Sequence, residues 1–190
     1  MRDVRGALVA VVVLTAFFGF VYPAAITGFS QLAFSHQAEG SLIKADGTVV
    51  GSRLAAQEFT SPRYFHERPS AVAYNAAGTS FANLGPTSPD LAKEVAQQAH
   101  AILKLEGPYN PGLTIHDIPV DAVTTSASGI DPDISVAYAR LQAPRIASVR
   151  HLPLATVQSL IRKHTDGRFI GFFGEPGVNV LELNVALDGA

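Results

Sequence analysis

The sequence of 190 residues contains no cysteine and no tryptophan, and only 16% of its residues are charged. Without cysteine the chain can form no disulfide, no thiolate zinc site and no cysteine nucleophile. Fourteen Lys and Arg against sixteen Asp and Glu give a net charge of -2. No basic field is therefore present to neutralise the phosphates of a nucleic acid, and the composition argues against nucleic-acid binding.

Several sequence motifs of enzymes are also missing. Neither the P-loop nor the dinucleotide-binding fingerprint occurs, and the glycines of "GFFGEPG" (171–177) have the spacing of a turn. No two of the six histidines stand four residues apart, as a zinc-binding helix requires. "TSASG" (125–129) lacks the first glycine of a nucleophile elbow, so Ser126 and Ser128 read most simply as loop residues. A membrane-anchored envelope hydrolase that pairs one of these serines with a distant histidine is kept as the alternative function.

A long apolar run near the N-terminus is the strongest single feature of the sequence. Residues 6–38 contain no Asp, Glu, Lys or Arg, and the apolar core from Ala7 to Ile26 is 20 residues long. As a helix, this length crosses the roughly 30 Å hydrocarbon layer of a membrane. A cleaved signal peptide is the rival interpretation, but its apolar region is usually only about 7 to 15 residues long. The sequence therefore favours an uncleaved transmembrane helix.

The distribution of basic residues predicts how this helix is oriented. Arg2 and Arg5 precede the apolar run, whereas Lys44 is the first basic residue after it. Because cytoplasmic flanks carry the excess of Lys and Arg, we expect a cytoplasmic N-terminus in the inner (plasma) membrane. The predicted organisation is an anchor over residues 1–34 and one extracytoplasmic α+β domain over residues 35–190.

Turn and capping signals divide this outer domain into elements. "SLIKADGTVVGS" (41–52) predicts a hairpin around Asp46-Gly47. Ser88 followed by Pro89 and Asp90 predicts the start of a helix that ends at Gly107. Three further expectations are an edge or short strand over 115–124, a helix over 153–167, and two strands over 168–189 with Leu181, Leu183, Val185 and Leu187 on one face.

The stretch "SGIDPDIS" (128–135) contains two aspartates next to a proline. Asp131 stands where a helix cap belongs, Pro132 in the first turn, and Asp133 near the positive end of the helix dipole. We therefore favour a capping role for the aspartates over a metal or acid/base site, because no neighbouring ligand is present in the segment. Pro144 is expected to interrupt the helix that follows.

Residues 57–90 are rich in Gly, Pro, Ser, Asn and Thr, with aromatic residues at intervals. A segment of this length and composition is either disordered or functional, and the aromatic residues argue for an ordered excursion. Three of them, Tyr64, Phe65 and Tyr74, are candidates for an interface with a partner protein, and burial in the core of their own domain is an equal alternative.

Four stretches, taken together and in this order, resemble a known family. They are "PRYFHERPSAVAYN" (62–75), "SFANLGPTSPDL" (80–91), "TTSASGIDPDISVAYARLQAPRIA" (124–147) and "GEPGVNVLELNVALD" (174–188). They look like the signature of the C subunit (KdpC family) of the Kdp-type potassium-transporting ATPase, and the likeness extends over almost the whole chain. One departure is Phe81 and Ala82, where the family usually has more Gly and Ser.

The resemblance implies a non-transporting accessory subunit of a high-affinity potassium uptake complex. The expected partners are a potassium-conducting channel-like subunit, a P-type ATPase subunit and a small stabilising peptide. The family is also described as a catalytic chaperone for ATP binding by the ATPase subunit, which implies Gln142 as the nucleotide contact and ATP as the cofactor. The predicted orientation places Gln142 on the opposite side of the membrane from the ATP pool. No catalytic residue and no metal site are expected in this chain.

Overall fold

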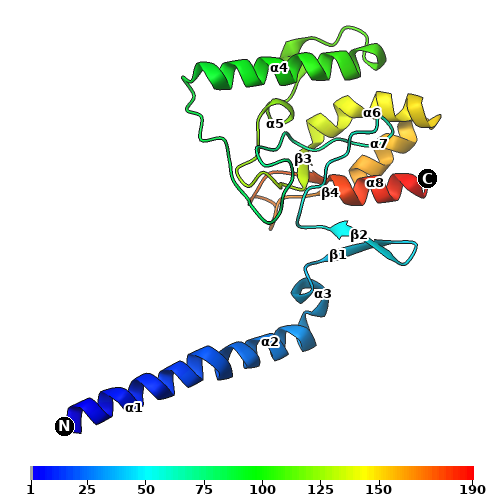
Figure 1. Cartoon of the computed structure of the whole chain (residues 1–190). Helices are drawn as coiled ribbons and strands as arrows, with labels where there is room; N and C mark the ends of the chain where they lie inside the picture. The colour runs from blue at the N-terminus through cyan, green and yellow to red at the C-terminus, as the bar shows by residue number, and fades with distance from the viewer. Residues whose placement is uncertain (1) are drawn as a thin grey trace. The chain divides into compact units, whose positions relative to one another are not determined.

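The structure is a computed structural model that describes residues 2–190 (Figure 1). The chain divides into two compact units, Met1–Leu42 and Ile43–Ala190. The first unit is almost entirely helical, and the second combines helices with short strands.

The first unit consists of one long apolar helix and a short helical turn. The long helix is made of α1 (Arg2–Ala16), a π-helical turn (Phe17–Val21) and α2 (Tyr22–Ala33), and α3 (Ser35–Ala38) follows it. Among the described residues, this 32-residue stretch is the one helix long and apolar enough to cross a membrane. The predicted N-terminal apolar helix is therefore confirmed, and it extends beyond Ala7–Ile26 at both ends.

The π-helical turn ends two residues before Pro23, and the sequence explains its position. Pro23 has no N–H to donate, and its ring crowds the carbonyl of Gly19 four residues earlier. The turn opens by one residue, so that the N–H of Tyr22 donates to the carbonyl of Phe17. The helix thus accommodates the proline without ending.

A hairpin opens the second unit, as the sequence predicts. Strands β1 (Leu42–Ala45) and β2 (Thr48–Ser52) form a two-stranded sheet. Asp46 and Gly47 between them have positive φ values of 49° and 78°. Asp-Gly is the usual pair for such a turn, because both central residues must be left-handed.

The second sheet has three short strands in the order β3-β5-β4. They are β3 (Asp133–Ser135), β4 (Thr165–Asp166) and β5 (Gly177–Asn179), and both outer strands run antiparallel to β5. In this register Ile134 lies opposite Val178, and Asp133 lies opposite Asn179. The sheet therefore joins three segments that are far apart in the sequence.

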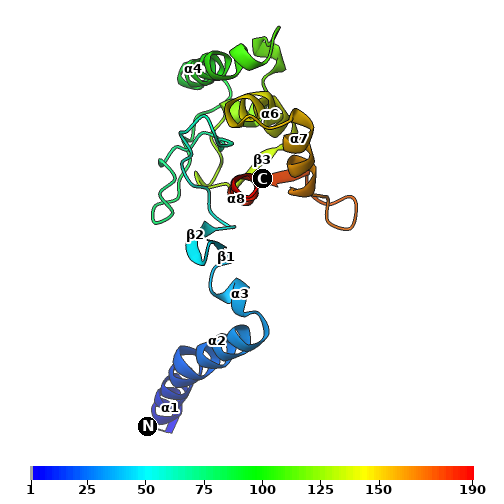
Figure 2. The ribbon, with the colours of Figure 1, turned by 90° about the vertical axis from the view of Figure 1, so that its right-hand side faces the viewer.

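Five α-helices and two 3-10 turns complete the second unit (Figures 1 and 2). In both views α6 and α7 lie side by side next to α8, and α4 forms the outer layer on the side of α6. The α-helices are α4 (Pro89–Glu106), α5 (Val120–Val123), α6 (Val136–Arg150), α7 (Leu154–Lys163) and α8 (Val180–Asp188), and the 3-10 turns span Gly107–Tyr109 and Ile115–Asp117.

The hydrophobic core lies among α6, α7, α8 and the three-stranded sheet. Burial of these side chains supplies the main stabilising free energy, at about 25 cal/mol per Å² of apolar surface. The fully buried members include Phe65, Ile134, Ala139, Ile146, Val157, Ile161, Val178, Leu183 and Leu187. The predicted α+β fold class is confirmed.

The start of α6 corrects the expected role of the aspartates. Asp133–Ser135 is a strand, and the helix begins at Val136. The N-cap is Ser135, whose Oγ accepts a hydrogen bond from the Tyr138 N–H at 3.0 Å. Asp131 instead accepts a hydrogen bond from the N–H of Asp133 in a local turn. The prediction that Asp131 caps the helix is therefore wrong, because a serine nearer to the apolar run takes that position.

Pro144 does not end α6, which was also predicted incorrectly. The helix continues to Arg150, and residues on both sides of the proline are buried. The side-chain amide of Asn110 donates to the carbonyl of Leu141 at 3.2 Å, within the turn that Pro144 disturbs. Tertiary packing on both sides of the proline offsets its cost.

Two segments expected to be strands are helical. Residues 115–124 form a 3-10 turn and the short helix α5, with Pro119 as the N-cap residue of α5. Residues 180–188 form α8, capped by Asn179, whose Oδ1 accepts from the Glu182 N–H at 3.1 Å. The buried leucines of α8 satisfy a strand pattern and a helix pattern equally, because this short helix is buried over most of its surface.

Candidate functional site

A buried ion pair links α4 and α6. Arg145 donates from Nε to Glu106 Oε1 at 2.8 Å, and their side chains are 0% and 2% exposed. The Arg145 guanidinium also donates to the carbonyls of Pro62 and Tyr64. Burial raises the pKa of Glu106, and the nearby Arg145 charge opposes that shift. Removing either charge would leave the other buried without its partner, at a cost of about 3–5 kcal/mol.

Two side-chain amides hold the segment after Ser61 against the helices. Gln142 of α6 accepts from the His66 N–H at 2.8 Å and donates to the His66 carbonyl at 3.0 Å. Asn184 of α8 does the same for Phe65, at 2.8 Å and 3.0 Å. The segment lacks strand partners here, and the two amides satisfy its buried backbone groups as a neighbouring strand would.

Gln142, the residue that the family resemblance implies as a nucleotide contact, is fully buried. Its Oε1 also accepts from Arg145 Nη2 at 2.9 Å. Both polar atoms of its amide are therefore engaged within the domain. The nucleotide contact stays a prediction, and the structure gives Gln142 a role in holding His66.

The three aromatic interface candidates occupy different environments. Phe65 is 0% exposed and belongs to the core. Tyr64 is half-buried, donates from its hydroxyl to Asp188 at 3.0 Å, and has the Arg150 guanidinium 5.0 Å from its ring centre. Tyr74 is half-buried and donates to the Arg68 carbonyl at 2.9 Å. The sequence left open whether these residues contact a partner or pack in the core, and Phe65 packs in the core.

A cluster of carboxyl groups surrounds Arg68. Arg68 forms an ion pair with Asp131 at 2.9 Å, and Asp133 accepts from the Asn179 amide at 3.1 Å. Glu67 is 5% exposed, and neither carboxyl oxygen has a partner at good hydrogen-bond geometry among the described residues, although the Gln57 backbone lies near enough to oppose the rise of its pKa. Burial, and secondarily Asp131 and Asp133, hold the pKa of Glu67 well above its usual range. Across residues 2–190, no group of three or more His, Asp and Glu side chains is placed to hold a metal ion.

Gly129, in the middle of the "SGIDP" stretch, sits directly against the long irregular segment. Its φ is 73°, and a Cβ at this position would lie 2.5 Å from Val72 Cγ2 and 3.0 Å from the Ser80 carbonyl oxygen. The Ser70 hydroxyl donates to the Gly129 carbonyl at 2.6 Å. Glycine is required here both by the backbone conformation and by the close approach of the segment.

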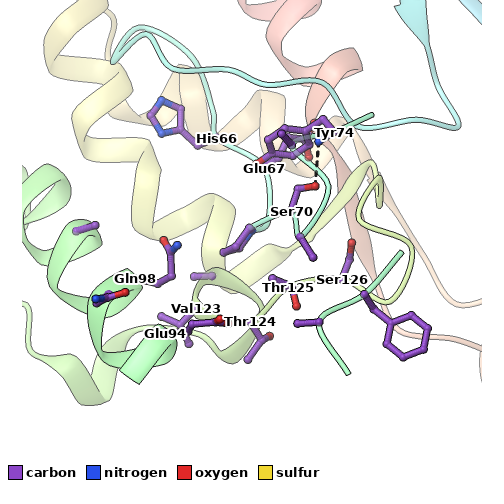
Figure 3. Close-up of a pocket in the computed structure, with 18 of the residues that line it drawn as sticks. His66, Glu67, Ser70, Tyr74, Glu94, Gln98, Val123, Thr124, Thr125 and Ser126 are labelled. Atoms are coloured by element: carbon purple, nitrogen blue, oxygen red, sulfur yellow. Dashed lines mark hydrogen bonds between the residues drawn. The ribbon is translucent and has the colours of Figure 1, made fainter. Parts of the chain in front are cut away.

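A cavity of about 1140 Å³ lies between α4, the irregular segment and the loop after α5 (Figure 3). Its lining includes Glu58, Glu67 and Glu94 but no Lys or Arg. Burial raises the pKa of Tyr74, which also lines it, to about 12. The lining therefore carries carboxyl, hydroxyl and amide groups. Figure 3 shows Glu94 and Gln98 on α4 and Glu67, Ser70 and Tyr74 on the irregular segment around this cavity.

The serines considered for a hydrolase bond to local backbone. Ser126 lines the cavity, and its Oγ accepts from the Gly129 N–H at 3.0 Å, whereas Ser128 Oγ accepts from the Ile130 N–H at 3.1 Å. His66 also lines the cavity, but its Nε2 lies 3.0 Å from the Ser61 carbonyl oxygen. Burial lowers the pKa of His66. Among these residues, no serine hydroxyl is hydrogen-bonded to a histidine ring, so the structure does not support the hydrolase alternative.

The polar residues buried inside the domain were not predicted from the sequence. Arg145, Glu106 and Asn184 are all buried, and none of them was singled out. A signal was present, because Arg145 and Asn184 each stand between two apolar residues, Pro144 and Ile146 in one case and Leu183 and Val185 in the other. A polar residue at a core position must find partners, which marks it as part of a network.

Comparisons with known proteins agree with this arrangement. The family model described as K+-transporting ATPase, c chain, matches residues 4–189. A protein of Herminiimonas arsenicoxydans called potassium-transporting ATPase KdpC subunit is 51% identical over 187 residues, covering 97% of this chain and 96% of its own length. Proteins with the same name from Mycobacterium tuberculosis (strain H37Rv) and Beijerinckia indica are 48% and 45% identical over 189 and 190 residues. These alignments cover 98% and 99% of this chain, and 98% and 94% of the two relatives.

The fold and the comparisons together define an α+β subunit of a transport ATPase with one N-terminal helix long and apolar enough to cross a membrane. The chain belongs to the family of the K+-transporting ATPase c chain. The family resemblance expected from the four sequence stretches is thereby confirmed.

Proposed function

We propose that this chain is an accessory subunit of a potassium-transporting ATPase complex. The observation that carries the proposal is the match over residues 4–189, together with relatives named as KdpC subunits that align over nearly their whole length. The function therefore concerns potassium transport by an assembly. The individual role of this chain within the assembly follows from its own structure.

The chain neither conducts the ion nor hydrolyses ATP by itself. It contributes one candidate membrane span, and a single helix cannot enclose a path for an ion. The buried polar groups of the outer domain bind one another and the backbone, as Arg145, Glu106 and Gln142 show. They act as structural groups that fix the shape of the domain.

The membrane helix anchors the chain in the inner membrane with its N-terminus in the cytoplasm and residues 35–190 outside. Arg2 and Arg5 precede the apolar stretch, and no Lys or Arg follows it before Lys44. This asymmetry supports the proposed orientation. The outer domain is then available to the extracytoplasmic face of the other subunits.

The partners proposed for the chain are the channel-like potassium-conducting subunit, the P-type ATPase subunit and the small stabilising peptide. The apolar helix supplies a contact within the membrane, because its side chains are exposed along its whole length. The outer domain supplies a second contact outside. Two contacts on one chain strengthen binding, because formation of the first raises the effective concentration of the second.

A role in ATP binding through Gln142 is a separate proposal that follows from family membership. It requires the amide of Gln142 to leave His66 and Arg145. If ATP binds there, it must raise the melting temperature of the purified chain, because a ligand that binds only the folded state stabilises it. The same addition must have no effect on a Gln142→Ala variant.

Co-purification tests the accessory-subunit proposal. The full chain, tagged and extracted from native membranes in mild detergent, should bring with it a P-type ATPase subunit and a potassium-conducting subunit in fixed ratio. Recovery of the chain without other subunits, under conditions in which the ATPase stays intact, would contradict the proposal.

A further inference from the structure

One short loop of the outer domain leaves four large apolar side chains exposed to solvent. Between β4 and β5, the stretch that we name the phenylalanine loop (168–175) contains Phe169, Ile170, Phe172 and Phe173. Their exposed fractions are 73%, 69%, 65% and 56%. Figure 2 shows this loop projecting from the domain after α7. Among the described residues after 43, no other stretch of similar length exposes four large apolar side chains.

The loop has a defined conformation. Phe169 and Phe173 form an antiparallel bridge, with the Phe169 N–H donating at 2.8 Å and the Phe173 N–H donating back at 3.0 Å. At the base, Arg168 Nη2 contacts both carboxyl oxygens of Glu175 at 3.0 Å and 2.8 Å. The rings of Phe172 and Phe173 lie 4.2 Å apart. The apolar side chains are therefore presented on a small hairpin.

The backbone of this hairpin carries strain. Ile170 has a φ of 52°, a left-handed conformation that a β-branched residue rarely adopts. Such conformations cost about 1–3 kcal/mol and persist where the surrounding structure or a function requires them. Polar residues would satisfy the turn better, so its present composition needs a reason other than folding of the loop itself.

The loop could contact either a lipid surface or a protein, and the net charge of the domain favours a protein. Residues 43–190 contain 12 Lys and Arg and 14 Asp and Glu, so the net charge is -2. A loop that inserts into an anionic membrane surface is normally supported by an excess of basic residues. Here the one cation of the loop, Arg168, is neutralised by Glu175. An apolar centre with a neutral polar rim is instead the composition of a protein interface.

We infer that the phenylalanine loop is the apolar anchor by which the outer domain docks into an apolar pocket on the extracytoplasmic face of another subunit of the complex. The inference rests on the proposed function, since it requires an assembled complex. Phe169 and Phe172 are the side chains with the largest exposed rings in the loop. Aromatic side chains that fill a partner's pocket contribute most of the binding free energy of an interface, while the surrounding contacts exclude water.

Because the chain has no cysteine, one introduced thiol reports on this loop alone. The full-length Phe172→Cys variant should be exposed to a maleimide reagent in three states: alone in detergent, alone in lipid vesicles, and in the complete complex in the same detergent. The labelled chain is separated from the other subunits by size. We expect rapid labelling in the first two states and labelling slowed by about tenfold or more in the complex, because a docked side chain is desolvated.

Ile115→Cys is the matched control, since Ile115 is 46% exposed and lies in the 3-10 turn Ile115–Asp117, outside the hollow that Glu175 lines at the base of the loop. It should be labelled at the same rate in all three states. Equal rates for Phe172→Cys alone and in the complex would overturn the inference. Slow labelling already in vesicles that contain only this chain would also overturn it, because the loop would then be covered by lipid.

A second variant separates docking from folding. Phe169→Ser combined with Phe172→Ser should leave the melting temperature of the chain unchanged, because both side chains are exposed, yet should weaken co-purification with the other subunits. If the double variant assembles as well as the wild type, the loop is not the anchor, although the proposed function stands. If the wild-type chain itself fails to co-purify, the proposed function fails first.

Discussion

The side chain of Gln142 binds both backbone polar groups of His66, accepting from its N–H at 2.8 Å and donating to its carbonyl at 3.0 Å. The side chain of Asn184 makes the same pair of hydrogen bonds with the backbone N–H and carbonyl of the preceding residue, Phe65. Two helices thereby fix consecutive residues of a segment that has no regular secondary structure. The long segment between β2 and α4 is ordered by side chains of other elements.

Gln142→Ala should destabilise the outer domain by about 2 kcal/mol or more, because the His66 N–H and carbonyl would be left buried and unsatisfied. The purified full chain in detergent, followed by circular dichroism on heating, measures the effect. Gln158→Ala is the matched control, since Gln158 is exposed on α7, and it should change the stability by less than about 0.5 kcal/mol. Equal effects of the two substitutions would show that the amide does not hold the segment.

Ser135→Ala should cost more stability than Asp131→Asn. Ser135 caps α6 and its hydroxyl donates to Asp121 at 2.8 Å, so we expect a loss of about 0.5–2 kcal/mol from the cap alone. Asp131→Asn keeps an oxygen for the Asp133 N–H and loses mainly a part-exposed ion pair with Arg68, worth about 0.2–1 kcal/mol. Thermal unfolding of both variants ranks them. A larger loss of stability in Asp131→Asn than in Ser135→Ala would contradict the assignment of Ser135 as the cap of α6.

These two residues show what the sequence could and could not predict. The order Asp-Pro-Asp is a common helix start, and it placed the helix four residues too early because the pairing of Asp133–Ser135 with β5 depends on residues 177–179. Strand pairing over 40 residues leaves no local signal. By contrast, α4 and the Asp46-Gly47 hairpin depend on neighbouring residues only, and both were predicted correctly.

The C-terminal helix could have been found. Asn179 followed three residues later by Glu182 is a capping signal, but the prediction rested only on the alternation of Leu181, Leu183, Val185 and Leu187. A helix buried over most of its surface has no polar face to reveal its period. The buried pairing of Arg145 with Glu106 was beyond prediction, because it joins residues 39 apart on two different helices.

Glu67 should make the stability of the chain fall as the pH rises. Burial holds the pKa of Glu67 in the folded state well above its usual range, so the folded state binds the proton more tightly than the unfolded state. Stability is therefore greatest below the usual glutamate pKa and is lost as the pH rises toward the elevated folded-state pKa. Asp131 and Asp133 act in the same direction.

Glu67→Gln removes this titration. Melting temperatures of the wild type and the variant, compared from mildly acidic to mildly alkaline buffer, should diverge as the pH rises, with the variant more stable at the alkaline end. Glu39→Gln is the control and should follow the wild type, because Glu39 is exposed and lies after α3 in the first unit. Parallel curves for Glu67→Gln and the wild type would mean that Glu67 is ionised and satisfied in the folded chain.

The orientation in the membrane can be tested with single cysteines. Ser159→Cys, on the exposed face of α7, should react with an impermeant maleimide in cells whose inner membrane is intact, once the reagent can reach the outer face of that membrane. Asp3→Cys, before the apolar stretch, should react only after the inner membrane is permeabilised. The opposite pattern would place the outer domain in the cytoplasm, on the side of the ATP pool.

Potassium uptake by the assembled complex is the most direct test of the account. Deletion of this chain, with the other subunits expressed at their normal level, should abolish high-affinity potassium uptake and potassium-stimulated ATP hydrolysis, and the full chain supplied separately should restore both. The purified chain alone should show neither activity. Undiminished uptake and ATP hydrolysis in the deletion strain would contradict the conclusion that this chain is a required accessory subunit.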